Sequence, residues 1–279
     1  MATVPYGRRF GEPPLPQKMK VAVAQIACAL GDIDANVGKI RDFASRAKDA
    51  GSELVIFPEM SDTGYSMPVI QKYAAPWSEG AVPELKKIAT EFSIAIVCGV
   101  SERAGEAIYN SQVAIDQKGE IVAAYRKCHL FAPAPVEEHK CFSPGNQFSD
   151  FVRGGFHFGL SICYDLRFPE FYRILACDHG ANVFPISSAW PFPRLEHLRI
   201  LAMARAIENQ SYVILSNRVG RDDGVSFCGS SAIIDPYGAL LAAASADREE
   251  LITGELSIDI TKSVRERMPV FEHRRRDLY

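Results

Sequence analysis

Three residues of the chain have complementary chemistry, and each follows an apolar segment that is predicted to be a buried strand. Glu59 follows the letters LVIFP, Lys127 follows IVAAYR, and Cys163 follows FHFGLSI. A carboxylate can take the proton of a thiol, a thiolate can attack an electrophilic carbon, and an ammonium can stabilise the oxyanion that forms. If the fold brings the three strand ends together, these side chains suffice for nucleophilic catalysis by cysteine.

Cys163 is predicted to lie at a turn between a strand and a helix. The apolar run before it indicates a buried strand, and residues 168–170 begin a helical pattern that continues through Phe171, Ile174 and Leu175. Such a turn places the thiol near N–H groups at a helix terminus, which favours the thiolate and supplies donors for an oxyanion. A buried structural thiol is the alternative for one cysteine in isolation, and the other two residues argue against it.

Simpler alternatives also exist for Glu59 and Lys127. Glu59 lies at the carboxyl end of a strand, where an open α/β sheet forms its site crevice, but the alternative is a solvated loop carboxylate. Lysines are usually exposed, although the apolar neighbours of Lys127 favour partial burial. Glu138 lies in a proline-rich segment, residues 132–145, which is predicted to form a structured loop over the site.

The composition limits the classes of partner. The chain has 279 residues, 47% of them hydrophobic, and a formal net charge of −3, so it can bury a sizeable core and has no basic surplus for nucleic acid or an acidic membrane. It has no apolar run long enough to span a bilayer and no apolar segment typical of a signal peptide. We therefore expect a small molecule or further copies of the chain as partners, with no nucleic acid and no membrane.

The cysteines indicate the compartment and the absence of a metal site. There are seven of them, widely spaced and without a Cys-x-x-Cys pair. The sequence therefore predicts no zinc or redox site, and a reducing cytoplasmic location fits best.

The remaining pattern predicts an α/β fold. Residues 1–18 hold four prolines and predict a flexible or subunit-crossing arm, and residues 19–279 are expected to form a single domain. Strands alternate with helices, and each half of the chain then changes to a hairpin, so the halves look topologically related. The expected strands are 19–26, 54–57, 94–100, 109–115, 121–125, 156–162, 182–186, 212–216, 231–234, 239–243 and 251–258. The expected helices start at Asp34 or Asn36 and at about residues 82, 168, 194 and 261, whereas residues 271–279 show no packing pattern.

Three segments together resemble the nitrilase, or carbon–nitrogen hydrolase, superfamily. They are residues 57–59 (FPE), 125–130 (YRKCHL) and 163–170 (CYDLRFPE), in the order and spacing of the family, and the likeness extends over residues 19–279. The resemblance implies an αββα sandwich of two stacked sheets flanked by helices, with a Glu–Lys–Cys triad and no metal or organic cofactor. It also implies that subunits pair through helices next to the nucleophile, giving a homodimer with αββα–αββα layers or a higher homo-oligomer.

The same resemblance implies a role for each site residue. Glu59 is the general base, Cys163 is the nucleophile, and Lys127 stabilises the oxyanion together with the backbone N–H of Tyr164. A second glutamate of the family lies six residues before a Pro-Gly pair, and Glu138 has this spacing. Glu138 therefore takes the positioning role.

The residues after Cys163 favour amides over nitriles. Nitrile-hydrolysing members of the superfamily commonly have Trp-Glu there, whereas this chain has Tyr164 and Asp165. Residues 163–170 and 269–279 look most like the omega-amidase branch, whose members deamidate small dicarboxylic monoamides. N-carbamoyl amidohydrolases are close relatives of that branch.

The substrate pocket is expected beside the strand ends that carry the triad. Arg167 could dock a substrate carboxylate, and the alternative is an ion pair with Glu170. The residues expected to bind substrate are Tyr65, Phe131, Tyr164, Arg167, Ser188, Ala189 and Trp190.

Other classes of function remain open. A Cys–His hydrolase would use His129 as its base, but it would leave Glu59 and Lys127 without a role. An N-carbamoyl amidohydrolase or a nitrilase would use the same triad on another substrate, and a non-catalytic binding protein would lack a triad residue, which is not the case. The expected function is hydrolysis of a non-peptide carbon–nitrogen bond in a small linear amide, with release of ammonia through a cysteine thioester.

Overall fold

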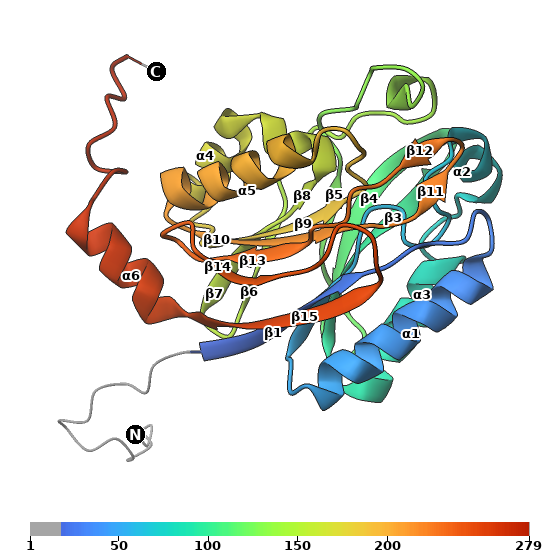
Figure 1. The fold of residues 1–279 in the computed structure, drawn as a ribbon, viewed down its shortest axis with the longest axis horizontal. Coiled ribbons are helices and arrows are strands. Elements are labelled where there is room, and N and C mark those ends of the chain that lie inside the picture. The colour runs from blue at the N-terminus through green and yellow to red at the C-terminus, as the bar shows by residue number, and fades with distance from the viewer. Residues whose placement is uncertain (1–17, 279) are drawn as a thin grey trace, which may run out of the picture.

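Two stacked β-sheets with helices on their outer faces make up the part of the chain that the computed structural model describes, residues 18–278 (Figure 1). The αββα sandwich predicted from the sequence is therefore confirmed. Residues 1–17 of the expected arm lie outside the described residues. Lys18, which was assigned to that arm, is already the first residue of a strand.

The first sheet has six strands in the order β15-β1-β2-β3-β4-β5. Its strands are β1 (Lys18–Gln25), β2 (Leu54–Ile56), β3 (Ala95–Ala104), β4 (Ala107–Ile115), β5 (Ile121–Arg126) and β15 (Glu250–Ser257). β1, β2 and β3 are parallel neighbours, and the other pairs are antiparallel. The predicted hairpin of β4 and β5 is present, and β15 returns from the end of the chain to pair with β1.

The second sheet follows the order β14-β13-β10-β9-β7-β6, with β8 also paired to β9. Its strands are β6 (Asp150–Arg153), β7 (Phe156–Gly159), β8 (Ser161–Ile162), β9 (Val183–Ser188), β10 (Tyr212–Asn217), β13 (Ala232–Ile234) and β14 (Leu240–Ala243). The predicted hairpin of β13 and β14 is present. A separate small hairpin of β11 (Arg221–Asp222) and β12 (Val225–Ser226) was not predicted.

Helices cover the two outer faces of the sandwich (Figure 1). The first sheet is covered by α1 (Ile33–Asp49) and α3 (Ala81–Phe92), and the second by α4 (Pro169–Cys177) and α5 (Leu195–Asn209). The remaining helices are α2 (Met67–Tyr73), α6 (Ile258–Arg267) and the 3-10 helices η1 (Glu138–Lys140) and η2 (Cys163–Arg167). Within residues 18–278, no helix has the length and apolar character needed to cross a membrane.

β1 shows how the sequence pattern specifies the layers. Val21 and Val23 point into the core between the two sheets, whereas Ala22 and Ala24 point toward the helices of the first sheet. Successive side chains of a strand face opposite sides, and a strand buried on both sides is apolar at every position.

The start of α1 differs from the prediction. The N-cap is Asp32, whose Oδ1 accepts from the Ala35 N–H at 3.0 Å. Asn36 is instead buried, and its Nδ2 donates to the carbonyls of Ala29 and Asp62 at 2.8 and 2.7 Å. The sequence alone could not distinguish a residue that caps the helix from one whose side chain joins two loops by hydrogen bonds.

The predicted strand 156–162 is interrupted at Leu160. The Leu160 N–H donates to the Ser149 carbonyl, and the Ser161 N–H donates to the side-chain oxygen of Gln112 at 3.1 Å. These two N–H groups bond to partners outside β9, with which β7 and β8 both pair. The apolar run is therefore divided into two strands.

The segment after α6 also packs more than its sequence suggested. Phe271 lies against the central core, with the guanidinium groups of Arg173 and Arg265 at 5.4 and 5.0 Å from its ring centroid. A single aromatic residue has no periodicity, so this contact could not be predicted from the sequence pattern.

Candidate active site

The three candidate residues lie together where strands of the two sheets end. Glu59 lies three residues beyond β2 and Lys127 directly follows β5, both in the first sheet, whereas Cys163 directly follows β8 of the second. The charges of Glu59 and Lys127 both act on the Cys163 thiol. The stacking of the sheets therefore assembles the set.

Glu59 can occupy its place because position 99 of the neighbouring strand β3 carries no side chain. The Gly99 N–H donates to the Pro58 carbonyl at 3.1 Å, and the Ser61 N–H donates to the Gly99 carbonyl at 2.8 Å. A Cβ at position 99 would lie 2.6 Å from the Glu59 Cα and 2.6 Å from the Pro58 oxygen. Only glycine lets the two backbones approach this closely.

The Lys127 backbone is fixed on both sides. Its N–H donates to the Asn110 carbonyl and its carbonyl accepts from the Gly145 N–H, both at 2.8 Å. A Cβ on Gly145 would lie 2.0 Å from the Arg126 oxygen. Glycine in the Pro-Gly pair therefore allows the loop that carries Glu138 to lie directly against the Lys127 strand end.

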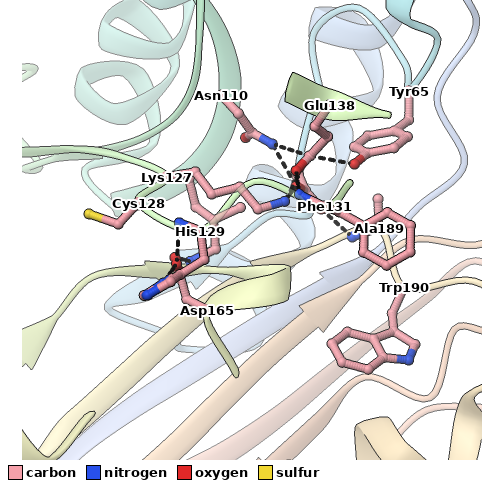
Figure 2. Close-up of polar contacts among 12 residues, drawn as sticks. Tyr65, Asn110, Lys127, Cys128, His129, Phe131, Glu138, Asp165, Ala189 and Trp190 are labelled. Carbon is pink, nitrogen blue, oxygen red and sulfur yellow. Dashed lines mark hydrogen bonds and ion pairs between the residues drawn. The ribbon is translucent and has the colours of Figure 1, made fainter. Parts of the chain in front are cut away.

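The Lys127 ammonium lies between the carboxylates of Glu59 and Glu138, and its contact with Glu138 can be followed in Figure 2. Its Nζ is 2.8 Å from Oε1 of Glu59 and 2.7 Å from Oε1 of Glu138, and none of the three side chains is exposed. Nδ2 of Asn110 donates to the same two oxygens at 2.6 and 3.0 Å. Buried charges are tolerated when they are paired and hydrogen-bonded, and both conditions hold here.

Backbone N–H groups hold the other carboxylate oxygens. Oε2 of Glu59 accepts from the Ala189 N–H at 2.8 Å, and Oε2 of Glu138 accepts from the Phe131 N–H at 2.6 Å. The Tyr65 hydroxyl donates to Oε1 of Glu138 at 2.5 Å. Glu138 thus has three donors on one oxygen and one on the other, an arrangement suited to orienting the ammonium.

Cys163 has a left-handed backbone conformation, with φ of 42°, which is uncommon for a residue with a Cβ. Burial raises the pKa of its thiol well above the ordinary value, and the charge of Glu59 raises it further, while Lys127 opposes this only in part. The sequence-based expectation of a favoured thiolate is therefore wrong for the resting site. A nucleophilic role of Cys163 would therefore require a base that removes the thiol proton.

Glu59 and Lys127 respond to burial in different ways. Burial raises the pKa of Glu59, with Lys127 opposing the shift and Glu138 adding to it. Burial alone would lower the pKa of Lys127, but the carboxylates of Glu138 and Glu59 outweigh it and hold this pKa above its usual value. Lys127 therefore stays protonated and positively charged. The raised pKa of Glu59 suits a general base.

A pocket of about 370 Å³, part of it open to solvent, leads to Cys163. It is lined by Tyr65, Phe131, Val136, Cys163, Tyr164, Arg167, Ala189, Trp190, Pro191, Arg194, Val225 and Phe227. Six of the seven residues expected to bind substrate are in this lining. The exception is Ser188, which is fully buried and does not line the pocket.

Two arginines bring positive charge to the pocket. The guanidinium of Arg167 lies 4.7 Å from the Trp190 ring centroid, and that of Arg194 lies 5.4 Å from another aromatic ring of the lining. The ion pair of Arg167 with Glu170 is absent from the contacts of the described residues. No acidic side chain from residues 18–278 lines the pocket, so both cations face it without a counter-charge.

A family comparison agrees with this arrangement. The model described as carbon-nitrogen hydrolase matches residues 20–266. The chain belongs to the carbon–nitrogen hydrolase family. Within residues 18–278 of this carbon–nitrogen hydrolase, no group of three or more His, Cys, Asp or Glu side chains could hold a metal ion.

Individual members of the family resemble the chain over most of its length. The 2-oxoglutaramate amidase of Bacillus subtilis (strain 168) is 35% identical over 263 residues, which cover 94% of this chain and 100% of that protein. The omega-amidase NIT2 of Homo sapiens is 31% identical over 253 residues, which cover 88% of this chain and 91% of that protein. Both similarities fit the amidase branch indicated by the sequence.

A solved structure gives a similar comparison. An amidase variant from Nesterenkonia sp. AN1, which shows covalent addition of the acetamide moiety of fluoroacetamide at its active-site cysteine, is 27% identical with a TM-score of 0.84. The match covers 96% of this chain and 98% of that chain.

His129 of this carbon–nitrogen hydrolase does not contact the thiol as a base would. Its Nδ1 lies 2.7 Å from Oδ1 of Asp165, and its ring stacks on Phe168 with centroids 3.7 Å apart. The geometry therefore gives no support to a Cys–His hydrolase.

Sequence reasoning missed several residues of this site. Asn110, which bonds both carboxylates, could have been noticed as the first of three polar residues, 110–112, in a strand that is apolar on either side of them. Arg194, Val225 and Phe227 had no comparable signal, because they reach the pocket from a turn and a hairpin that no local pattern connects to the triad.

Proposed function

We propose that this carbon–nitrogen hydrolase is an amidase that releases ammonia from a small carboxylate-bearing amide through a thioester on Cys163. The observation that carries the proposal is the buried Lys127 ammonium, held between Glu59 and Glu138 and acting electrostatically on the thiol. A fixed cation in a site of low dielectric constant stabilises an oxyanion far better than it would in water.

In the first half-reaction, Glu59 takes the proton of the Cys163 thiol as the sulfur attacks the amide carbon. The carbonyl oxygen becomes an oxyanion, which Lys127 and the backbone N–H of Tyr164 stabilise. When the carbonyl forms again, the carbon–nitrogen bond breaks. The nitrogen leaves as ammonia with the proton that Glu59 returns.

In the second half-reaction, Glu59 takes a proton from water as the water oxygen attacks the thioester carbon. The carbon–sulfur bond breaks, the product acid forms, and the proton on Glu59 returns to the sulfur of Cys163. The enzyme is regenerated, and no cofactor is required by this balance.

The pocket lining supports a substrate with a distal carboxylate. Arg167 and Arg194 both line the pocket that leads to Cys163, and a carboxylate could accept charge-assisted hydrogen bonds from a guanidinium there. The similarity to 2-oxoglutaramate amidase points to the same class of substrate. We therefore propose a dicarboxylic monoamide, either 2-oxo-substituted or unsubstituted.

A matched panel of substrates tests the proposal. Ammonia release should be fastest with 2-oxoglutaramate or glutaramate, slower with a neutral aliphatic amide of similar length, and slowest with a nitrile. Mass spectrometry of the enzyme quenched during turnover should show an acyl group on the peptide that contains Cys163. Faster turnover of an N-carbamoyl compound would instead favour the carbamoyl branch, and the absence of ammonia release from every amide would refute the proposal.

We further propose that two copies of the chain pair through α4 and α5, which flank the nucleophile. On α5, Ile200 and Ile207 are 62% and 52% exposed, although they are large apolar side chains. Light scattering should give the mass of a dimer, and Ile200→Glu together with Ile207→Glu should reduce it to that of a monomer.

All seven cysteines are free, which supports a reducing compartment such as the cytoplasm.

A further inference from the structure

Asp165 is fully buried and accepts four hydrogen bonds. Its Oδ1 accepts from the His129 backbone N–H at 3.2 Å and from His129 Nδ1 at 2.7 Å (Figure 2). Its Oδ2 accepts from the Tyr125 hydroxyl at 2.8 Å and from the Ile162 N–H at 2.9 Å. An ionised carboxylate can only accept, so Nδ1 of His129 carries the proton of this bond.

The four donors come from the two segments that carry the chemistry. Ile162 directly precedes Cys163, whereas Tyr125 and His129 lie two residues before and two residues after Lys127. One carboxylate therefore connects the turn of the nucleophile with the segment of the ammonium. These segments belong to different sheets.

The turn at Cys163 needs such a restraint. Its φ of 42° is disfavoured for a residue with a Cβ and is maintained only by the surrounding structure. The bond from the Ile162 N–H closes the turn on one side, and the bond from the Phe168 N–H to the Asp165 carbonyl at 2.9 Å closes it on the other.

The His129 ring is packed as well as hydrogen-bonded. It stacks on Phe168 with centroids 3.7 Å apart and an interplanar angle of 11°, and it meets Phe171 edge-on at 5.8 Å. Phe168 follows the same turn as Asp165, so the ring is held by the segment that it restrains. The hydrogen bond of His129 to Asp165 and its stacking on Phe168 therefore couple the position of the Lys127 segment to that of the turn.

We propose that His129 and Asp165 are a positioning pair. Together they hold the Cys163 thiol and the Lys127 ammonium in the relative positions that the transition state requires. The inference rests on the proposed function and deepens it. It predicts a defect in kcat with little change in KM, because the arginines and aromatic residues of the pocket do not contact this pair through any described hydrogen bond. Small displacements of reacting groups are sufficient for large losses in rate.

A second histidine–aspartate pair in the chain provides a matched control. His179 Nδ1 is 2.7 Å from Oδ2 of Asp150, the same distance as in the first pair, and the His179 side chain is 32% exposed compared with 31% for His129. Neither His179 nor Asp150 lines the pocket. The two histidines are thus alike in distance and exposure, whereas their aspartates differ: Asp165 is fully buried and holds the turn of Cys163, and Asp150 is 27% exposed and also pairs with His157.

The experiment compares His129→Leu, His129→Asn and His179→Leu with the wild type, using ammonia release from the best substrate and peptide-resolved alkylation by iodoacetamide. His129→Leu should lower kcat by roughly 10- to 100-fold, as expected for misplaced reacting groups, with KM nearly unchanged. It should also change the alkylation rate of Cys163 but not that of Cys177. His129→Asn, which keeps a nitrogen donor near the position of Nδ1, should recover most of the lost kcat.

Equal kcat in His129→Leu and His179→Leu, or no recovery in His129→Asn, would overturn the proposal. If His129→Leu fails to fold, the decision passes to Tyr125→Phe, which removes the hydroxyl that donates to Oδ2 of Asp165 and accepts from the Cys128 N–H at 3.0 Å. Unchanged kcat in that variant would then be decisive against the pair. Failure of the proposed function would be distinct, because the wild type itself would release no ammonia, whereas the alkylation comparison requires no turnover.

Discussion

The buried end of the active site and the wall of its pocket differ in how completely their charges are matched. At the buried end, Lys127 has two carboxylate partners, and every oxygen of Glu59 and Glu138 has a donor. In the wall, Arg167 and Arg194 contact aromatic rings, and no carboxylate of the described chain lines the pocket with them. Charges matched within the fold serve the same reaction on any substrate, whereas an unmatched cation favours a substrate that brings an anion.

Removal of the nucleophile should have the largest effect at the buried end. Cys163→Ala should lower kcat by roughly 10⁴-fold or more, by analogy with other hydrolases that lose the nucleophile. The fold should persist, because the missing sulfur leaves only a small gap. Ammonia release and circular dichroism measure the two properties, and Cys177→Ala at the end of α4 is the control. Retained turnover in Cys163→Ala would remove the covalent mechanism.

Loss of the ammonium should affect both rate and stability. Lys127→Met should cost roughly 3 kcal/mol or more of transition-state stabilisation, as removal of an oxyanion donor does elsewhere. It should also lower the free energy of unfolding by about 3–5 kcal/mol, because two buried carboxylates lose their cation. Lys87→Met, at an exposed ion pair with Glu84, is the control for denaturant unfolding. Full activity in Lys127→Met would contradict the assignment of this residue.

The pocket wall should respond only to substrates with a carboxylate. Arg167→Ala should reduce kcat/KM for a dicarboxylic monoamide by roughly 10- to 100-fold and leave a neutral aliphatic amide nearly unchanged. Arg46→Ala, at an exposed ion pair on α1, is the control. If Arg167 is only structural, the variant will have a lower Tm while the preference between the two substrates survives.

The smallest predicted effect is a shift in pH dependence. The hydrogen bond from Asn110 lowers the pKa of Glu59, so Asn110→Leu should raise that pKa beyond its already raised value. The base must be ionised to act, and activity is lost as the pH falls through its pKa. The acid limb of kcat/KM should therefore move to higher pH, whereas Asn182→Leu, away from the pocket, should leave it in place. A shift to lower pH in Asn110→Leu would show that the stated cause is wrong.

The strands and helices could be predicted because their signals are local and repeated, whereas the αββα stacking was implied by the resemblance of three segments to the superfamily. Apolar runs mark the strands, and Glu59, Lys127 and Cys163 each follow such a run, while the spacing of Glu138 to its Pro-Gly pair is tied to the close approach of Gly145 to Arg126. The apolar runs and the residues that follow them are neighbours in sequence, so these signals can be recognised before the fold is known.

Other properties depend on contacts between distant segments. The break at Leu160 follows from donors that bond to Ser149 and to the Gln112 side chain, and neither partner is indicated by the run itself. The raised pKa of Cys163 depends on how much of its surroundings excludes water, which no turn pattern states. The second cation of the pocket, Arg194, reaches it only because the segment before α5 lies beside Phe131.

The missing side chain at Gly99 has a consequence for how the enzyme tolerates variation. Position 99 supplies no reacting atom, yet a methyl group there would press on the backbone of Glu59 from 2.6 Å. A variant at this position could therefore abolish turnover while every catalytic group is still present in the sequence. A survey of variants that scores only the triad would class such a change as harmless. In the proposed reaction, however, the space beside Glu59 is required as much as the carboxylate that occupies it.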